Sequence, residues 1–548
     1  MVERLVSQLI EGPYQGAETT HAISNSIWAL GVMQHRVPND LVKNLLETLV
    51  RNLSEAKALQ GPKAVTMVLM GASNMGFKID RATVEKLVAH FLSCESAQGD
   101  QLGVGNVVKA LGDMRQTLPR EMFRSLFDIL ANNLASVDPT TVSQVLLGSS
   151  MIAESHSTDF EIDASLLEEL VGVIISHKGK NVQHLSNTIF AVGKMKQSGF
   201  GLPDETFEKL FDLFMSKMRH DPEADIIQGI HLSQVLLGAS NQGFNIAPGE
   251  LEYLVKYIIE LLGSRSDDSQ LQLVANSIKA VGDMEHKLPP TMLQALLDSF
   301  VKKLPRGEEN VDISISQVLL GLSKQHFRID RTSLETILDR LEAKTCQIQA
   351  LSNSIWSLGY LREHVPQNAG GSASFQRLLY IYLLRLPEAR AVDISKVLQG
   401  IVKEKFPIDA TSLEMMIEQF LRQKRNPGPR RTANTLWSLG EIKCDFPATK
   451  AEAFYRKILD LFMASLPEAK LHHCIAVVHG CAKLGLALEE PIVDALIQQC
   501  FSQQPDDVDS NHLNDIGLLL WALGKLNFRH KLNDDQIQQL ETLYGPSE

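Results

Sequence analysis

The stretch SNSIWALG, residues 24–31, decides the fold because related copies of it recur along the whole chain. The clearest copies read SNTIFAVG (186–193), ANSIKAVG (275–282), SNSIWSLG (352–359) and ANTLWSLG (433–440). VGNVVKALG (104–112) and LLLWALG (518–524) are weaker copies of this first form. Recurrence of one short motif at a regular interval is the sequence signature of a repeat architecture.

A second form of the motif lies between these copies. It reads SQVLLGSS (143–150), SQVLLGAS (233–240) and SQVLLGLS (316–323), with looser versions at 66–73, 395–402 and 475–482. Aligning the Asn of the first form with the Gln of the second gives thirteen anchors: Asn25, Met67, Asn106, Gln144, Asn187, Gln234, Asn276, Gln317, Asn353, Lys396, Asn434, Ala476 and Leu518. The anchors are about 41 residues apart, as expected for helix pairs, and the two forms alternate strictly.

The columns of this alignment indicate tightly stacked helices. Two residues after the anchor every copy is aliphatic, and four residues after it every copy has Gly, Ala or Ser. All copies of the first form also have Gly six residues after the anchor. Gly in a helix interior costs roughly 1 kcal/mol relative to Ala. We therefore expect a neighbouring helix to approach so closely that only a small residue fits.

A second helix is predicted after each motif. In the first form it begins after an apolar residue and Pro, as at 37–38, 118–119, 202–203, 288–289, 365–366 and 446–447. In the second form it often begins at Ile-Asp, as at 79–80, 162–163, 329–330 and 408–409, where Asp can cap the helix. No segment alternates with period two. The sequence predicts an all-α solenoid (superhelix) of about thirteen helix pairs at residues 21–528, with an N-terminal capping segment at 1–20 and a C-terminal capping helix at 529–548.

Composition restricts the function classes. The 548 residues are 44% hydrophobic and 22% charged, with a formal net charge of −12. A negative chain repels nucleic acid at long range, so a nucleic-acid binder would need a local basic track. Six cysteines favour a reducing compartment. With neither a secretory signal nor a membrane-spanning apolar run, we expect a cytoplasmic monomer that does not insert into membranes.

The motifs SNSIWALG and ANTLWSLG resemble the core of octotricopeptide-type repeats, which are organellar RNA-binding solenoids. They also resemble the SKWP-type repeats of large effectors secreted by plant-pathogenic bacteria. The resemblance extends over nearly the whole chain in its period, although no PPPEW-like segment is present. It implies an α-helical repeat protein that binds RNA or protein. If the effector resemblance holds, the protein would be translocated into a host cell.

No motif in the sequence predicts catalysis. A phosphate-binding G-x-x-x-x-G-K-[ST] loop, a G-x-G-x-x-G turn, an H-E-x-x-H helix and a G-x-S-x-G elbow are all missing from it. His472, His473, Cys474, His479 and Cys481 are residue types that zinc favours, but they lie on one predicted helix and cannot converge on one ion. We therefore interpret them as packing residues and predict no enzyme activity, no cofactor and no metal.

The Asn column of the first form is the best candidate binding surface. All four Trp residues follow an anchor by three positions, which places them on the same helix face as the anchor. The candidate partner-binding residues are Asn25, Trp28, Asn106, Lys109, Asn187, Phe190, Asn276, Lys279, Asn353, Trp356, Asn434 and Trp437. Asn can hydrogen-bond an extended backbone or a base edge, and an aromatic ring can stack. The alternative is structural: Trp fills the core between repeats and Asn ties down a neighbouring turn.

The most basic stretch of the chain contains Arg422, Lys424, Arg425, Arg430 and Arg431, interrupted by Pro and Gly. We expect it to form a solvated loop between repeats, or a contact for phosphate or an acidic partner.

The function that follows from this sequence is a non-enzymatic binding scaffold. The net charge favours a protein partner, in the manner of the effector repeats. The alternative is sequence-selective binding of single-stranded RNA, which a continuous basic groove on the concave surface would favour.

Overall fold

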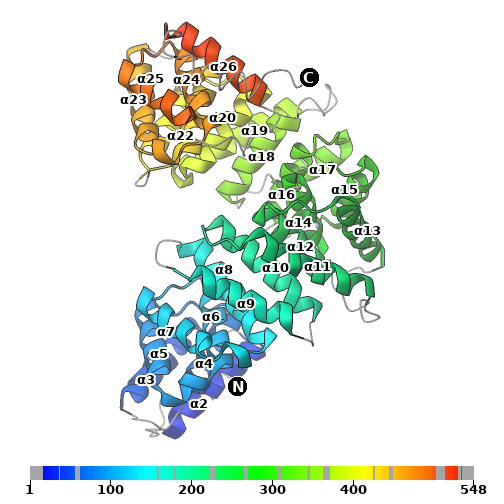
Figure 1. Cartoon of the computed structure of the whole chain (residues 1–548), viewed down its shortest axis with the longest axis vertical. Coiled ribbons are helices and arrows are strands. Elements are labelled where there is room, and N and C mark those ends of the chain that lie inside the picture. Colours follow the sequence, from blue (N-terminus) through cyan, green and yellow to red (C-terminus); the bar gives the residue numbers. More distant parts are fainter. Residues whose placement is uncertain are drawn as a thin grey trace. The chain divides into compact units, whose positions relative to one another are not determined.

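The described residues of the computed structural model form α-helices joined by short connections, among which are four 3-10 turns (Figure 1). It describes residues 17–35, 37–55, 62–156, 160–177, 181–220, 229–264, 270–284, 286–304, 311–341, 346–361, 371–423, 426–442, 448–501, 512–528 and 532. These residues contain no strand, as the sequence predicts. Most of the two predicted capping segments, at 1–20 and 529–548, lies outside the described residues.

Each of the thirteen anchors lies on the first helix of a pair, which we call the A helix; the second is the B helix. The chain divides into two compact units, Met1–His286 and Lys287–Glu548. The A helices of the first unit are α2 (Ala17–Val32), α4 (Pro62–Asn74), α6 (Gln101–Asp113), α8 (Pro139–His156), α10 (Val182–Gln197), α12 (Gly229–Gln242) and α14 (Gln270–Asp283). Its B helices are α3 (Asn39–Glu55), α5 (Arg81–Ser93), α7 (Arg120–Ala131), α9 (Ala164–Ser176), α11 (Asp204–His220) and α13 (Pro248–Ser264).

The second unit has the same construction. Its A helices are α16 (Val311–Lys324), α18 (Ile348–Leu361), α20 (Ala391–Glu404), α22 (Pro429–Glu441), α24 (Leu471–Leu484) and α26 (His512–Lys525). Its B helices are α15 (Pro290–Lys303), α17 (Arg331–Leu341), α19 (Gly371–Leu384), α21 (Ala410–Leu421), α23 (Ala448–Met463) and α25 (Glu490–Phe501). The 3-10 turns are η1 (Glu95–Gly99) and η2 (Leu134–Ser136) in the first unit, and η5 (Leu386–Glu388) and η6 (Leu466–Glu468) in the second. Within each unit every A helix packs on the next A helix, and B helices also contact one another, as α3 does α5 and α15 does α17, so the protein is an α-helical repeat solenoid.

The predicted small-residue contacts are present. A Cβ atom on Gly71 of α4 would lie 2.5 Å from the carbonyl oxygen of Ile27 in α2, and one on Gly31 would lie 2.4 Å from the carbonyl oxygen of Gly71. The same interlock joins α6 to α8, α10 to α12, α18 to α20 and α22 to α24. Each contact joins a first-form helix to the second-form helix that follows, which explains why the two forms alternate.

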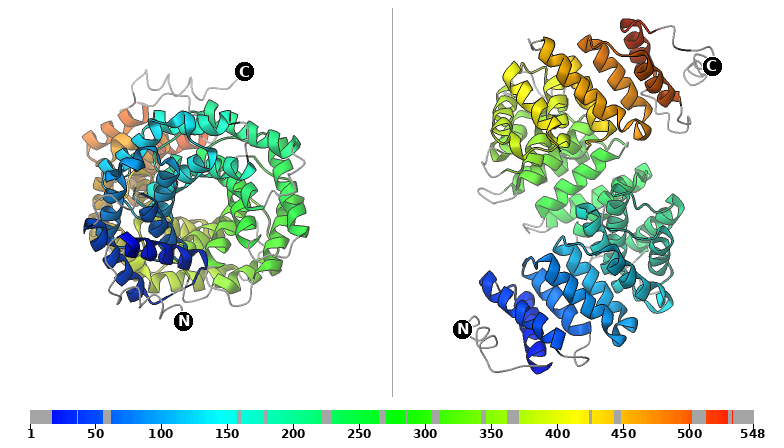
Figure 2. Two further views of the ribbon diagram at one scale, coloured as in Figure 1. Left: turned by 90° about the horizontal axis from the view of Figure 1, so that it is seen from below. Right: turned by 90° about the vertical axis from the view of Figure 1, so that its left-hand side faces the viewer.

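The B layer is spaced by larger side chains. Phe160, in the connection before α9, packs on Phe123 of α7, with ring centroids 5.3 Å apart. Phe244, before α13, packs on Phe207 of α11 at 5.2 Å. A layer spaced by glycine is shorter than a layer spaced by phenylalanine, so each stack curves with its A helices on the concave side. The inner and outer layers of the first unit can be followed in blue to green in Figure 2.

The predicted starts of the B helices are confirmed where they are described. Asp80, Asp163, Asp330 and Asp409 each accept a hydrogen bond from a backbone amide two or three residues later. Helices α3, α7, α11 and α15 begin directly after the predicted prolines. The Pro steps at 365–366 and 446–447 lie outside the described residues. None of the helices described combines the length and apolar composition that a membrane span requires.

Candidate ligand-binding groove on the A helices

The half-exposed side chains of the A helices occur at the anchor and three and seven residues after it. These positions recur on one side of an α-helix. We call the surface they form the inner face, because the A helices lie on the concave side of each stack. The predicted Asn and Trp, Phe or Lys columns both lie on this face: among them only Trp28 is largely exposed, at 44%, and only Asn353 is buried.

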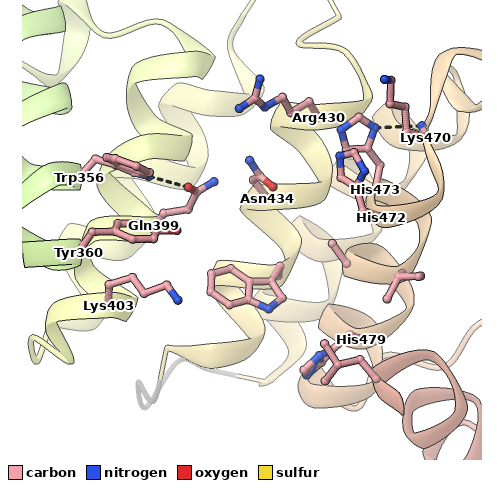
Figure 3. Close-up of a pocket in the computed structure, with 14 residues that line it drawn as sticks. Trp356, Tyr360, Gln399, Lys403, Arg430, Asn434, Lys470, His472, His473 and His479 are labelled. Atoms are coloured by element: carbon pink, nitrogen blue, oxygen red, sulfur yellow. Dashed lines mark hydrogen bonds between the residues drawn. The ribbon is translucent and has the colours of Figure 1, made fainter. Parts of the chain in front are cut away.

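A groove of about 570 Å³ lies in the inner face of the second unit, across α18, α20, α22, α24 and α26 (Figure 3). Its lining is aromatic, amide and basic, with three aliphatic side chains and, among the described residues, no carboxylate. The lining residues are Trp356, Tyr360, Gln399, Lys403, Arg430, Asn434, Trp437, Lys470, His472, His473, Ile475, Ala476, His479 and Leu518. Four residues predicted from the sequence, Trp356, Arg430, Asn434 and Trp437, therefore come together in one groove.

The rings in this groove are held by specific contacts. The indole N–H of Trp356 donates to Oε1 of Gln399 at 2.8 Å, and its ring stacks on Tyr360 with centroids 4.1 Å apart. The ammonium of Lys403 lies 5.0 Å from the ring centroid of Tyr360 and 5.9 Å from that of Trp437. Cations at this distance are attracted to the ring face. Lys403 of α20 thus lies between two aromatic rings, one from each of the A helices beside it, α18 and α22.

The charges of the two inner faces differ. In the first unit, Lys109, Lys194 and Lys279 each form an ion pair, with Asp113, Glu154 and Asp283 respectively. In the second unit, Lys403 and Arg430 form no ion pair with any described carboxylate. Lys396 donates to the amide oxygen of Asn353 at 2.7 Å, and Arg430 is close enough to lower the pKa of Lys396, after the larger effect of burial. Two basic side chains of the second unit's inner face, Lys403 and Arg430, are therefore not neutralised by any described carboxylate.

The Asn column is mostly free of intramolecular partners. Asn353 accepts from Lys396, and Asn276 accepts from the Gln272 amide at 2.7 Å. No hydrogen bond is formed by the side chains of Asn25, Asn106, Asn187 or Asn434 with any other described residue. Within the described part of the chain, these four amides therefore do not tie down a neighbouring turn.

The basic stretch predicted from the sequence separates into different environments. Arg422, at the end of α21, pairs with Glu418 at 3.0 Å, and Arg431 donates to the carbonyl oxygen of Pro427 at 2.7 Å. Arg430 and Arg431 lie in the first turn of α22, not in a loop, because Pro429 is compatible with the first helical position and begins the helix. Only Arg430 reaches the groove; Lys424 and Arg425 lie outside the described residues.

The histidine and cysteine cluster divides between the groove and the core. Cys474 and Cys481 are buried in the core, whereas His472, His473 and His479 line the groove. Burial, more than the neighbouring charges, lowers the pKa of His473 to about 4, and it also lowers the pKa of His479. Both imidazole rings are therefore neutral at pH 7. Among the described residues no group of three or more His, Cys, Asp or Glu side chains is arranged to hold a metal ion.

The first unit has a smaller groove of about 380 Å³, across α2, α4 and α6. Trp28 and Asn106 of the predicted columns line it. Met67, Met70 and Leu102 make its surface largely apolar, and the charged residues Lys63 and Asp100 also line it.

Ten of the fourteen residues that line the main groove were not predicted as binding residues from the sequence. Gln399 and His479 lie three residues after second-form anchors, and Tyr360 and Lys403 lie seven residues after anchors. The helical period could have identified these four residues. It was used only for the first-form repeats, and only for the anchor and the position three residues after it. Lys470 and His473 lie before the anchor of α24 and carry no repeat signal.

No family model matches the sequence, and a search of curated proteins finds no match. Solved structures do resemble the chain. A homology model of the full-length AP-3 complex in an intermediate open conformation is 12% identical with a TM-score of 0.28, covering 99% of this chain and 92% of that one. The crystal structure of Kap121p bound to Ste12p is 10% identical with a TM-score of 0.29, and the match covers 98% of this chain and 68% of that one. A pentatricopeptide repeat protein in complex with an 18-nt RNA element is 13% identical with a TM-score of 0.27, and the match covers 99% of this chain and 93% of that one.

Proposed function

We propose that this protein is a non-enzymatic RNA-binding solenoid that holds single-stranded RNA on the inner face of its second unit. The observation that carries the proposal is the groove in which Trp356, Tyr360 and Trp437 alternate with the cations Lys403 and Arg430. Aromatic platforms combined with unpaired positive charge are what single-stranded nucleic acid binds. Asn434 and Gln399 add amide groups that can hydrogen-bond base edges.

The net charge of −12 does not oppose this proposal. Over distances longer than about 10 Å salt screens charge, so a ligand in the groove responds to the local field. In the groove that field comes from the lining cations Lys403, Arg430 and Lys470, and at one end from Glu441, whose carboxylate lies 3.4 Å from Nε2 of the lining His479. The net charge of the whole chain favoured a protein partner at the level of sequence; the distribution of the charges favours RNA. The resemblance to octotricopeptide repeats also favours RNA over a protein partner.

The test is selection of ligands from a randomised RNA pool, followed by fluorescence anisotropy with the selected RNA. We expect binding that weakens steeply with salt, and a protein with Lys403 and Arg430 both changed to Gln that binds at least about tenfold more weakly. If no RNA is bound even at low salt, the proposal is wrong.

A second candidate function, binding of a protein segment, is favoured by the groove of the first unit. Its Trp28, Met67 and Met70 surface is apolar, and Met adapts to varied apolar partners. This is the scaffold function that the effector-type resemblance implies. Selection of displayed peptides, with Met70→Lys as the negative variant, tests it: peptides that bind both forms equally would exclude this groove as the binding site.

A further inference from the structure

One end of the main groove is formed by the N-terminal turns of α22 and α24. Arg430 is the second residue of α22, and Lys470 directly precedes α24. His473 lies in the first turn of α24 and, like both cations, lines the groove. Backbone amides at a helix N-terminus favour an anion, and two cations beside them increase that preference.

The hydrogen bonds of His473 fix its tautomer. The backbone N–H of Lys470 donates to Nδ1 of His473 at 3.1 Å, so Nδ1 carries a lone pair. The pKa of His473 is lowered to about 4, first by burial and then by the positive charge of His472, Arg430 and Lys470. The ring is therefore neutral at pH 7, and its one proton is on Nε2.

The Nε2–H group of His473 is a buried donor whose acceptor is missing. The side chain is 6% exposed, and Nε2 has no hydrogen-bond partner among the described residues. Figure 3 shows the ring between Arg430 and Lys470 at the edge of the groove. Leaving a buried donor unpaired is costly, and an acceptor on a ligand in the groove would satisfy it.

The equivalent position in α20 shows what is special about His473. Asp393 also lies three residues before its anchor, and it accepts from the backbone N–H of Arg390 at 3.1 Å. Its other carboxylate oxygen accepts from Ser352 at 3.2 Å. Asp and His thus make the same backbone contact. The second polar atom of Asp is an acceptor that is already satisfied, whereas that of His473 is a donor facing the groove.

We propose that Nε2 of His473, the guanidinium of Arg430 and the ammonium of Lys470 bind one phosphate group of the RNA backbone. This inference rests on the proposed function and locates one contact of the ligand. Asn434 and Trp437 follow Arg430 by four and seven residues, on the same side of α22. The phosphate is held at the N-terminal end of α22, and the attached base extends along the helix toward Trp437.

Two substitutions of nearly the same shape test the site. Glu and Gln at this helix position can both accept the preceding backbone N–H. His473→Gln keeps a donor toward the groove, whereas His473→Glu presents only acceptors and a negative charge. Arg430→Gln removes an exposed charge without touching the core. Arg422→Gln removes an arginine that is already paired with Glu418 and serves as the matched control.

The measurements are anisotropy with the selected RNA, thermal stabilisation by inorganic phosphate, and circular dichroism to verify folding. We expect His473→Glu and Arg430→Gln to weaken RNA binding by about 10- to 100-fold, the effect of a lost charge-assisted hydrogen bond. His473→Gln and Arg422→Gln should stay within about threefold of the unaltered protein.

The outcomes separate this inference from the proposed function. If RNA binds and all four variants bind it equally, the phosphate site is wrong and the proposed function stands. If RNA does not bind but inorganic phosphate stabilises the unaltered protein and not His473→Glu, the phosphate site stands and its assignment to RNA is overturned. If neither RNA nor phosphate binds, both proposals are wrong.

Discussion

Gly238 of α12 packs directly against Ile189 of α10: a Cβ atom added to Gly238 would lie 2.3 Å from the carbonyl oxygen of Ile189. No real Cβ approaches an oxygen so closely, and a backbone carbonyl inside a helix cannot move aside cheaply. The two helices can approach this far only because the residue is glycine. The contact therefore explains why glycine occupies this position in the second-form repeats.

Gly238→Ala should accordingly destabilise the first unit. We expect the free energy of unfolding to fall by about 1–3 kcal/mol, as for other overpacked sites. Gly172→Ala is the matched control, because Gly172 is also helical but nothing lies within 4 Å of its added Cβ. That change should raise stability by up to about 1 kcal/mol through helix propensity. Urea unfolding followed by circular dichroism compares the two; equal effects would contradict the close-packing argument.

Asn353 and Asn434 should respond differently to truncation, although they occupy equivalent anchors. Asn353→Ala leaves the half-buried ammonium of Lys396 without its acceptor, which should lower the free energy of unfolding by about 1–3 kcal/mol. Asn434 has no partner among the described residues, so Asn434→Ala should change stability by less than about 0.5 kcal/mol. Thermal unfolding measures both. A large loss for Asn434→Ala would favour the structural interpretation of the column.

The fold could be predicted from the sequence because its determinants are local. A glycine such as Gly71 marks a helix contact wherever it recurs, and a residue such as Asp80 marks the start of the next helix. The small residue recurs in all thirteen repeats and the Ile-Asp step in four of them, at the same interval, so these patterns are not due to chance. The division of the helices into two compact units has no such signal, because the motif continues through the boundary at His286.

The site could be predicted only in part. The helical period placed Trp356 and Trp437 on the inner face, where both line the groove. It did not distinguish Lys109, which is neutralised by Asp113 four residues later, from Lys403, which faces two rings and pairs with no described carboxylate. The role of His473 depends on the backbone N–H that Nδ1 accepts, and no residue pattern reports that contact.

The lowered pKa of His473 predicts acid sensitivity of the second unit. The ring titrates at about 4 in the folded protein, against 6.5 for an unperturbed His. Below pH 6.5 the unfolded chain takes up a proton that the folded protein does not, so stability falls as the pH decreases toward 4. His473→Gln should reduce this loss by about 1–3 kcal/mol. Urea unfolding at pH 7, 5.5 and 4.5 measures the free energy of unfolding of both proteins. The same dependence on pH in both would contradict the lowered pKa of His473.

Trp437 and Trp28 test which inner face binds RNA. Trp437→Ala should weaken RNA binding by about 1–3 kcal/mol, the contribution of one stacked base, whereas Trp28→Ala should leave it unchanged. Both side chains are partly exposed on the inner faces, so neither truncation opens a large core cavity. Anisotropy titrations with the selected RNA compare them. Equal losses would mean that the ligand also contacts the first unit.

The salt dependence of binding should report on individual lysines. Each phosphate contact to a single strand contributes about −0.7 to the slope of log K against log salt concentration. Lys403 forms no ion pair with a described carboxylate, so Lys403→Met should weaken binding and reduce the steepness of the slope by about 0.7. Lys109 is paired with Asp113 in the first unit, so Lys109→Met should change neither quantity. Titrations at several salt concentrations measure both slopes. If Lys403→Met lowers affinity without changing the slope, Lys403 acts by orienting Tyr360 and Trp437, and its contact with a phosphate is excluded.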